Sequence, residues 1–200
     1  IYYPIEKFLA RYTDLFITIN DEDFNRVKEK FNANLRVEII DGIGVDFKRL
    51  KIDNINEVRS KYRGELNIPE DATVLIYVAE LIKNKNQQLL IKSLKQLLCA
   101  TKNVFLVLVG PDHLNGEYQK LALKLDVYDN IRFLGWRSDV SQLLVSSDIC
   151  VASSLREGFG INLVESMFCG LPVIATNNRG HRTIIDNNTN GMIVENNTCE

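Results

Sequence analysis

The sequence has little of what several classes of protein require. Its four cysteines include no C-x-x-C pair, which argues against a metal site or a disulfide framework. With a net charge of −2 it has no broad basic field, so we expect no nucleic acid partner. No apolar run reaches the roughly 20 residues that span a bilayer. We expect no signal peptide either, because Ile1–Pro4 is not followed by a basic region and an apolar run.

What is present is ordinary for a soluble globular protein: 46% hydrophobic and 25% charged residues. The cysteines, three of them in apolar runs, are predicted to be buried, reduced thiols of a cytoplasmic protein: Cys99, Cys150, Cys169 and Cys199. The chain begins without methionine and ends in a polar, Asn-rich tail, so we expect a fragment of a longer protein.

Strand-like and helix-like segments alternate along most of the chain. Strands are predicted at 15–19, 37–40, 73–78, 104–109, 131–134, 148–152, 172–175 and 191–194. Helices are predicted at about 20–31, 56–66, 87–100, 116–125, 139–146 and 160–168. Strands 73–78 and 104–109 are apolar at nearly every position, which is typical of strands buried on both faces. The pattern predicts an α/β fold, a Rossmann-like parallel sheet with helices on both faces.

In such a sheet, ligands bind outside the carboxyl ends of the strands. After the strand at 73–78, Lys83 and Lys85 place two ammonium groups beside the start of a helix. This combination suits a diphosphate, which is bound by cations and free backbone N–H groups together. A solvated basic loop would show the same residues.

The segment after the strand at 148–152 is the most informative. Glu157 lies in a loop, Gly158 and Gly160 open the next helix, and Glu165 lies within that helix. The glycines would let backbone amides approach a ligand at the positive end of the helix. Glu165 stands among apolar neighbours, so its carboxylate needs a partner, and the vicinal hydroxyls of a ribose would supply one.

These two carboxylates also have simpler interpretations. Glu157 could be a solvated loop residue, and Glu165 could form a structural ion pair with Arg179 or Arg182. Taken with the glycines between them, the two acids favour a ligand site.

Three further segments follow strands. Gly110 and Pro111 follow one strand and could simply form a turn, whereas Leu134 and Gly135 could border a nucleobase. Trp136 beside them is expected in the core, and His181 at the surface or in a hinge, because no catalytic partner for it is evident.

Together these marks resemble the retaining GT-B glycosyltransferases that carry an E-x7-E signature, in particular the capsule and exopolysaccharide branch. The signature corresponds to Glu157–Glu165, with Gly158, Phe159 and Gly160 inside it. Segments 40–46, 78–86, 133–135 and 170–175 resemble the family's other motifs, and Gly110–Pro111 its turn after the second strand. By this resemblance, residues 1–44 are the end of an N-terminal acceptor domain with its linker. Residues 45–200 are then a C-terminally truncated donor-binding domain, the C-terminal half of a GT-B fold.

The resemblance implies a role for each matching residue. Lys85 would bind the donor diphosphate, Glu165 the ribose and Glu157, as the catalytic carboxylate, the hydroxyls of the transferred sugar. The remaining donor-binding residues would be Lys83, Gly158, Phe159, Gly160, Asn162, Leu163, Leu134, Gly135 and Gly110. The donor would be a UDP- or GDP-sugar, used with retention and with no metal or other cofactor. The acceptor would be a glycan or a polyprenyl-linked glycan, in bacterial surface polysaccharide synthesis at the inner face of the membrane.

Two departures and two alternatives accompany the resemblance. Glu80 replaces the family's arginine, so that cation is either missing or supplied by Lys83, and Gly42-Ile43 replaces the hinge Pro-Asn. A non-hydrolysing sugar-nucleotide epimerase shares the two-domain architecture, and a nucleotide-binding module without chemistry would share the donor fold. With most of the acceptor domain missing, we expect the fragment alone to be inactive in transfer.

Overall fold

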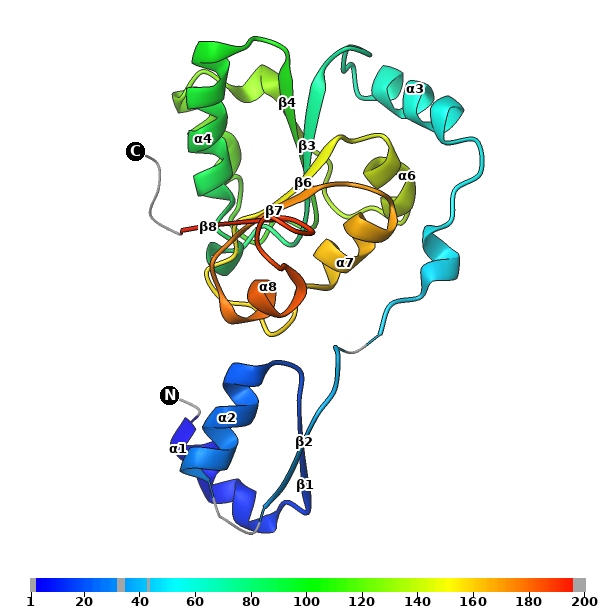
Figure 1. Cartoon of the computed structure of the whole chain (residues 1–200). Coiled ribbons are helices and arrows are strands. Elements are labelled where there is room, and N and C mark those ends of the chain that lie inside the picture. Colours follow the sequence, from blue (N-terminus) through cyan, green and yellow to red (C-terminus); the bar gives the residue numbers. More distant parts are fainter. Residues whose placement is uncertain (1–2, 32–34, 43, 196–200) are drawn as a thin grey trace.

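The computed structural model describes residues 3–31, 35–42 and 44–195, which form two separate parallel sheets (Figure 1). The small sheet pairs β1 (Leu15–Thr18) with β2 (Arg36–Ile39). The large sheet has, in spatial order, β5 (Ile131–Phe133), β4 (Val104–Val109), β3 (Thr73–Val78), β6 (Ile149–Ala152), β7 (Val173–Thr176) and β8 (Met192–Val194). Ile43 of the linker motif and Cys199 lie outside the described residues.

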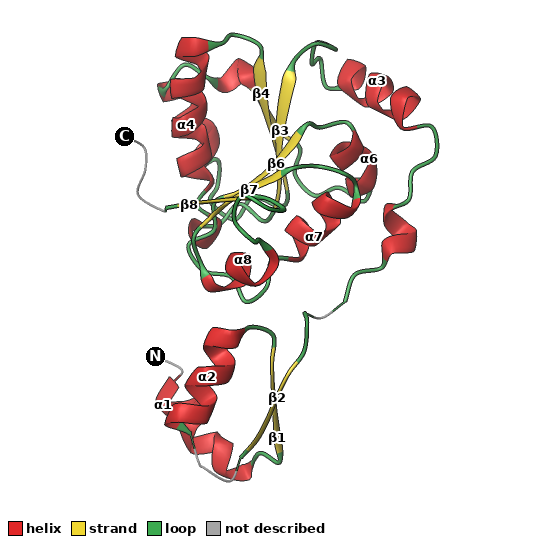
Figure 2. Cartoon of the chain, viewed as in Figure 1, coloured by secondary structure: helices red, strands yellow, loops and turns green. Residues whose placement is uncertain are grey.

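Helices cover both faces of the large sheet (Figure 2). On one face α4 (Gln87–Ala100) packs with α5 (Glu117–Lys124); on the other lie α3 (Ile55–Glu65), α6 (Val140–Val145) and α7 (Ile161–Phe168). The predicted α/β fold with a parallel sheet is therefore confirmed. The predicted ranges 73–78, 87–100 and 104–109 coincide with β3, α4 and β4.

The order of the strands creates a point where the chain changes direction across the sheet. From the central β3 the chain steps outward to β4 and β5, then returns to the other side of β3 to form β6, β7 and β8. The connections after β3 and β6 therefore leave neighbouring strands toward opposite sides. A crevice opens between such connections, and ligands of doubly wound sheets bind there.

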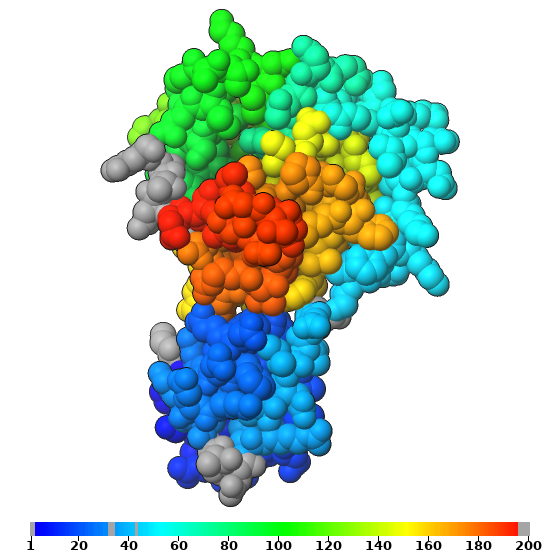
Figure 3. All heavy atoms as spheres, in the orientation of Figure 1, coloured from blue at the N-terminus to red at the C-terminus, as the bar shows by residue number. Residues whose placement is uncertain are grey.

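The N-terminal residues form a separate lobe that packs against the rest of the chain (Figure 3). We call the described part of residues 3–40 the small lobe and residues 47–195 the large lobe. Besides its sheet, the small lobe holds α1 (Tyr3–Leu9) and α2 (Asp21–Lys30). The assignment of these lobes to an acceptor and a donor domain stays a prediction.

Several sequence expectations were wrong. Trp136 is 74% exposed, not in the core, and Cys99 is exposed on α4, whereas Cys150 is buried and Cys169 partly buried. The helices α1 and α8 (Arg179–Ile184) were not predicted. Both are short, yet α8 carries one recognisable signal, because the side chain of Asn178 accepts a hydrogen bond from the amide of His181 and caps the helix.

One buried cation joins α3 to the sheet. Arg63 is 1% exposed and donates to the carbonyl oxygens of Ser146, Glu70 and Ala72 at 3.0, 2.7 and 2.9 Å. It also pairs with Asp148 at 2.8 Å, immediately before β6. The guanidinium therefore satisfies acceptors from two separate segments, 70–72 and 146–148, and joins both to α3.

Replacing Arg63 by methionine should lower the free energy of unfolding by about 3–5 kcal/mol, because it leaves these buried acceptors without donors. Urea unfolding followed by circular dichroism measures the change. Lys61→Met on the same helix is the control, since the Lys61 side chain is 66% exposed and should change stability by about 0.5 kcal/mol or less. Equal losses for the two variants would contradict the prediction.

Candidate functional site

A pocket of about 440 Å³ opens at the point where the chain changes direction across the sheet. It is lined by Ile19, Val78, Lys85, Glu157, Gly158, Phe159, Gly160, Ile161, Asn162 and Glu165. Val78 ends β3, Lys85 ends the 3-10 helix η3 (Lys83–Lys85), and Gly160 precedes α7. Ile19 alone comes from the small lobe, so the pocket faces the interface between the lobes.

Seven of the residues predicted from the sequence line this pocket together: Lys85, Glu157, Gly158, Phe159, Gly160, Asn162 and Glu165. The other five do not line it. Lys83 is exposed, and Leu163 is buried with its amide bonded to the carbonyl of Gly160. Gly110, Leu134 and Gly135 gather instead at the ends of β4 and β5, where the amide of Gly110 donates to the carbonyl of Gly135 at 2.8 Å.

The Glu157 carboxylate ends a chain of hydrogen bonds that begins in the core. Its Oε1 pairs with Lys85 Nζ at 2.5 Å and accepts from Ser154 Oγ at 2.6 Å. Because Ser154 donates to the carboxylate, the Tyr77 hydroxyl donates in turn to Ser154 Oγ, at 2.6 Å. Burial raises the pKa of Tyr77, which keeps this donor protonated. Glu157 is therefore an oriented carboxylate and not a solvated loop residue.

Hydrogen bonds also join the two loops that carry Lys85 and Glu157. Ser153 Oγ donates to the carbonyl of Lys85 at 2.8 Å, and Asn84 Nδ2 donates to the carbonyl of Arg156 at 3.0 Å. The amide of Leu155 donates to the carbonyl of Asn84 at 2.8 Å. These contacts keep the lysine and the carboxylate at a fixed spacing.

Glu165 lies on α7, is partly buried and lines the same pocket. Burial raises its pKa, and the charge of Arg49, near the start of the large lobe, lowers it in part. The alternative that Glu165 forms a structural ion pair with Arg179 or Arg182 is wrong. Arg179 pairs with Asp23, and Arg182 pairs with Glu22. The carboxylate is therefore held at the pocket with no ion pair among the described residues.

The start of α7 offers backbone amides to the pocket. Gly160 has a φ of +102°, in the left-handed region that favours glycine, and the helix begins at Ile161. The amides of Ile161 and Asn162 have no hydrogen-bond acceptor among the described residues, and they stand at the positive end of the helix dipole. A cation, two carboxylates and these amides thus surround one open space.

Sequence reasoning missed the buried residues that support the site. His181 is fully buried, not at the surface, and its Nδ1 donates to the carbonyl of Thr176 at 2.7 Å. Burial lowers its pKa, so the ring is neutral. Tyr77 and Ser154 gave no signal, because a tyrosine and a serine at the ends of apolar strands are unremarkable until the strands are placed side by side.

The linker touches the site from outside. Gly42 has a φ of +80°, and a Cβ on it would lie 2.5 Å from the ring of Phe159. Phe159 therefore packs on a glycine of the connection between the lobes. No side chain fits at this position without moving the ring.

Comparisons with known proteins agree on one family. The family model described as Glycosyl transferases group 1 matches residues 58–200. The chain is 41% identical, over 98% of its length, to the protein named glycosyltransferase EpsD of Bacillus subtilis (strain 168). It is 25% identical, also over 98% of its length, to the UDP-Gal:alpha-D-GlcNAc-diphosphoundecaprenol alpha-1,3-galactosyltransferase of Escherichia coli. The chain spans about half of these relatives, 51% of each.

Solved structures include the same architecture. The crystal structure of Anabaena HepE in complex with UDP and glucose matches with a TM-score of 0.84 at 26% identity. The match covers 96% of this chain and 52% of that one. Among the described residues, no helix has both the length and the apolar character needed to cross a membrane.

Replacing Glu165 by glutamine should raise the free energy of unfolding at pH 7. A carboxyl whose pKa is raised on folding costs the folded state free energy while it is ionised, and nothing once it is protonated. The gain should therefore shrink as the pH falls and vanish below about 4, where the carboxyl is mostly protonated in both states. Urea unfolding of the variant and of the unmodified chain, at pH 7 and at the low pH, measures the difference in the free energy of unfolding. The exposed Glu117, replaced in the same way, should give no gain at pH 7, and a gain for Glu165→Gln that grows at low pH would refute the prediction.

Proposed function

This chain belongs to the glycosyl transferases group 1 family, and from that premise we propose that it is the donor-binding portion of a retaining glycosyltransferase. The enzyme would move a sugar from a nucleoside-diphosphate sugar to a glycan or lipid-linked acceptor in bacterial surface polysaccharide synthesis. It would work in the cytoplasm, at the inner face of the membrane if the acceptor is lipid-linked.

The observation that carries the proposal is the convergence of Lys85, Glu157 and Glu165 on the pocket at the start of α7. A diphosphate is the ligand that uses both a lysine and free amides at a helix N-terminus. We assign Lys85 to the diphosphate, Glu165 to the ribose hydroxyls and Glu157 to the hydroxyls of the transferred sugar.

The same groups explain how the leaving group would depart. Breaking the bond between the sugar and the diphosphate builds negative charge on the phosphate oxygen. Lys85 and the positive end of α7 would stabilise that charge, so the chemistry requires no metal ion. Lys85 is paired with Glu157 in the present structure, so an arriving diphosphate would share or replace that contact. Retention follows from the family resemblance at Glu157–Glu165.

The donor and acceptor are proposed from the relatives. The structure of HepE contains UDP and glucose, and the galactosyltransferase of Escherichia coli is named for UDP-Gal and a diphosphoundecaprenol-linked acceptor. We therefore favour a UDP-sugar over a GDP-sugar, and a polyprenyl-linked acceptor.

Isothermal titration calorimetry with UDP, UDP-glucose, GDP and GDP-mannose tests the proposal. We expect saturable binding of UDP and UDP-glucose. Lys85→Gln and Glu165→Gln should each weaken it by about ten- to hundred-fold, since each removes a hydrogen bond with a charged group. Lys92→Gln, at an exposed position on α4, is the matched control and should bind as the unmodified chain does.

Absence of binding to all four compounds would refute the proposal, and preference for the GDP compounds would change only the base. An epimerase is tested separately, by incubation with UDP-N-acetylglucosamine alone. Appearance of the epimer would overturn the transferase assignment.

A further inference from the structure

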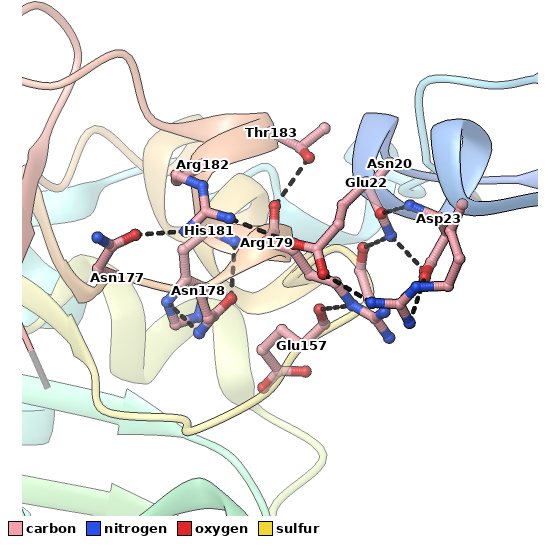
Figure 4. A network of polar contacts seen from close by, with 12 residues as sticks. Asn20, Glu22, Asp23, Glu157, Asn177, Asn178, Arg179, His181, Arg182 and Thr183 are labelled. Atoms are coloured by element: carbon pink, nitrogen blue, oxygen red, sulfur yellow. Dashed lines mark hydrogen bonds and ion pairs between the residues drawn. The ribbon is translucent and has the colours of Figure 1, made fainter. Parts of the chain in front are cut away.

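The loop that carries Glu157 is held from the small lobe by a buried asparagine (Figure 4). Asn20 is 1% exposed and precedes α2. Its Oδ1 accepts from the amide of Asp23 at 2.8 Å and so caps the helix. Its Nδ2 donates to Asp23 Oδ2 and to the carbonyl oxygen of Gly158, both at 2.9 Å. One side chain therefore ends a helix in one lobe and fixes a peptide group in the other.

An arginine links the two lobes in the same way, through the carbonyl group of the preceding residue, Glu157 (Figure 4). Arg179, the first residue of α8, pairs with Asp23 Oδ1 at 2.5 Å, and its Nε donates to the carbonyl oxygen of Glu157 at 3.3 Å. Asp23 thus holds both Asn20 and Arg179, and these hold the carbonyls of Gly158 and Glu157.

Close packing leaves this loop little room to adjust. A Cβ on Gly180 would lie 2.8 Å from both Glu157 Cβ and the amide nitrogen of Phe159. A Cβ on Gly158 would lie 3.2 Å from the side chain of Ile19. The loop is therefore packed between α8 and the residues just before α2.

Holding a carbonyl also holds the amide behind it. A trans peptide group is planar with its N–H opposite its C=O, and the described residues contain no cis peptide bond. Fixing the carbonyls of Glu157 and Gly158 therefore fixes the directions of the amides of Gly158 and Phe159. Neither amide has a hydrogen-bond acceptor among the described residues.

We propose that Asn20 and Arg179 are positioning residues for the donor site. They hold the peptide groups on either side of Gly158, and so they aim Glu157 and two unpartnered amides at the sugar of the bound donor. Because Asp23 and Asn20 belong to the small lobe, the sugar subsite is complete only while the two lobes are in contact. The inference rests on the proposed function, in which Glu157 contacts the transferred sugar.

The neighbouring pair on the same two helices provides a control. Arg182 contacts Glu22 at 3.3 Å, with side chains 51% and 45% exposed, and its side chain makes no hydrogen bond or ion pair with the described residues of the Glu157 loop (Figure 4). Its replacement removes the same charge from the same helix and a contact between the same lobes, but leaves the loop carbonyls held.

The test compares how tightly variants bind UDP and UDP-glucose by calorimetry. Asn20→Ser keeps a hydroxyl that can cap α2 but has no donor that reaches Gly158, and Arg179→Gln removes the donor to Glu157. In each, we expect the dissociation constant for UDP-glucose to rise about five-fold more than that for UDP, since one oriented hydrogen bond is lost. Arg182→Gln should leave the ratio of the two constants unchanged. Thermal unfolding of each variant checks that it is folded.

A purely structural role would lower the melting temperature and leave the ratio unchanged. If folded Asn20→Ser and Arg179→Gln show the unmodified ratio, the inference is overturned while the proposed function stands. If the unmodified chain binds neither compound, or binds UDP-glucose no more tightly than UDP, the proposed sugar contact itself fails, and with it the inference.

Discussion

The ion pair between Lys85 and Glu157 joins two loops that are 72 residues apart in the sequence. They meet only because β3 and β6 are neighbours in a sheet whose strand order changes direction between them. Every other part of the site depends on this meeting. Ser153 and Asn84 fasten the loops to each other, Ser154 and Tyr77 orient the carboxylate, and α7 begins immediately after it.

The predictions that succeeded were those that depend on long patterns. Strands such as 73–78 and 104–109 are apolar throughout, so their bounds and their parallel arrangement follow from burial on both faces. The site residues after β3 and β6 could be found by the same logic, because ligands bind where such strands end. The roles of these residues rest on their chemistry and on the family resemblance, and they stay predictions.

The predictions that failed concern single side chains. Whether Trp136 or His181 is buried depends on the direction of one side chain in a loop or a short helix. The hydrophobic periodicity of the sequence does not predict that direction. Tyr77 and Ser154 support the site through one 2.6 Å contact between β3 and the residues just after β6. Such contacts depend on register, which the composition of a strand does not reveal.

Arg63 and Glu165 are both removed from water, at least in part, but only one of them has protein partners that compensate for the lost solvation. Arg63 has a partner for nearly every donor and joins three segments of the fold. Glu165 has no ion pair among the described residues and keeps a raised pKa at the edge of an open pocket. A group left unsatisfied at a pocket is common at binding sites, where the ligand completes its coordination.

The packing of Phe159 on Gly42 gives the connection between the lobes a second property. Phe159 lines the pocket, and its ring lies against Gly42, whose backbone conformation favours glycine. A rotation at Gly42, which would swing one lobe against the other, must therefore displace an aromatic wall of the pocket. The Phe159 ring therefore couples the pocket to the connection between the lobes, because it touches both.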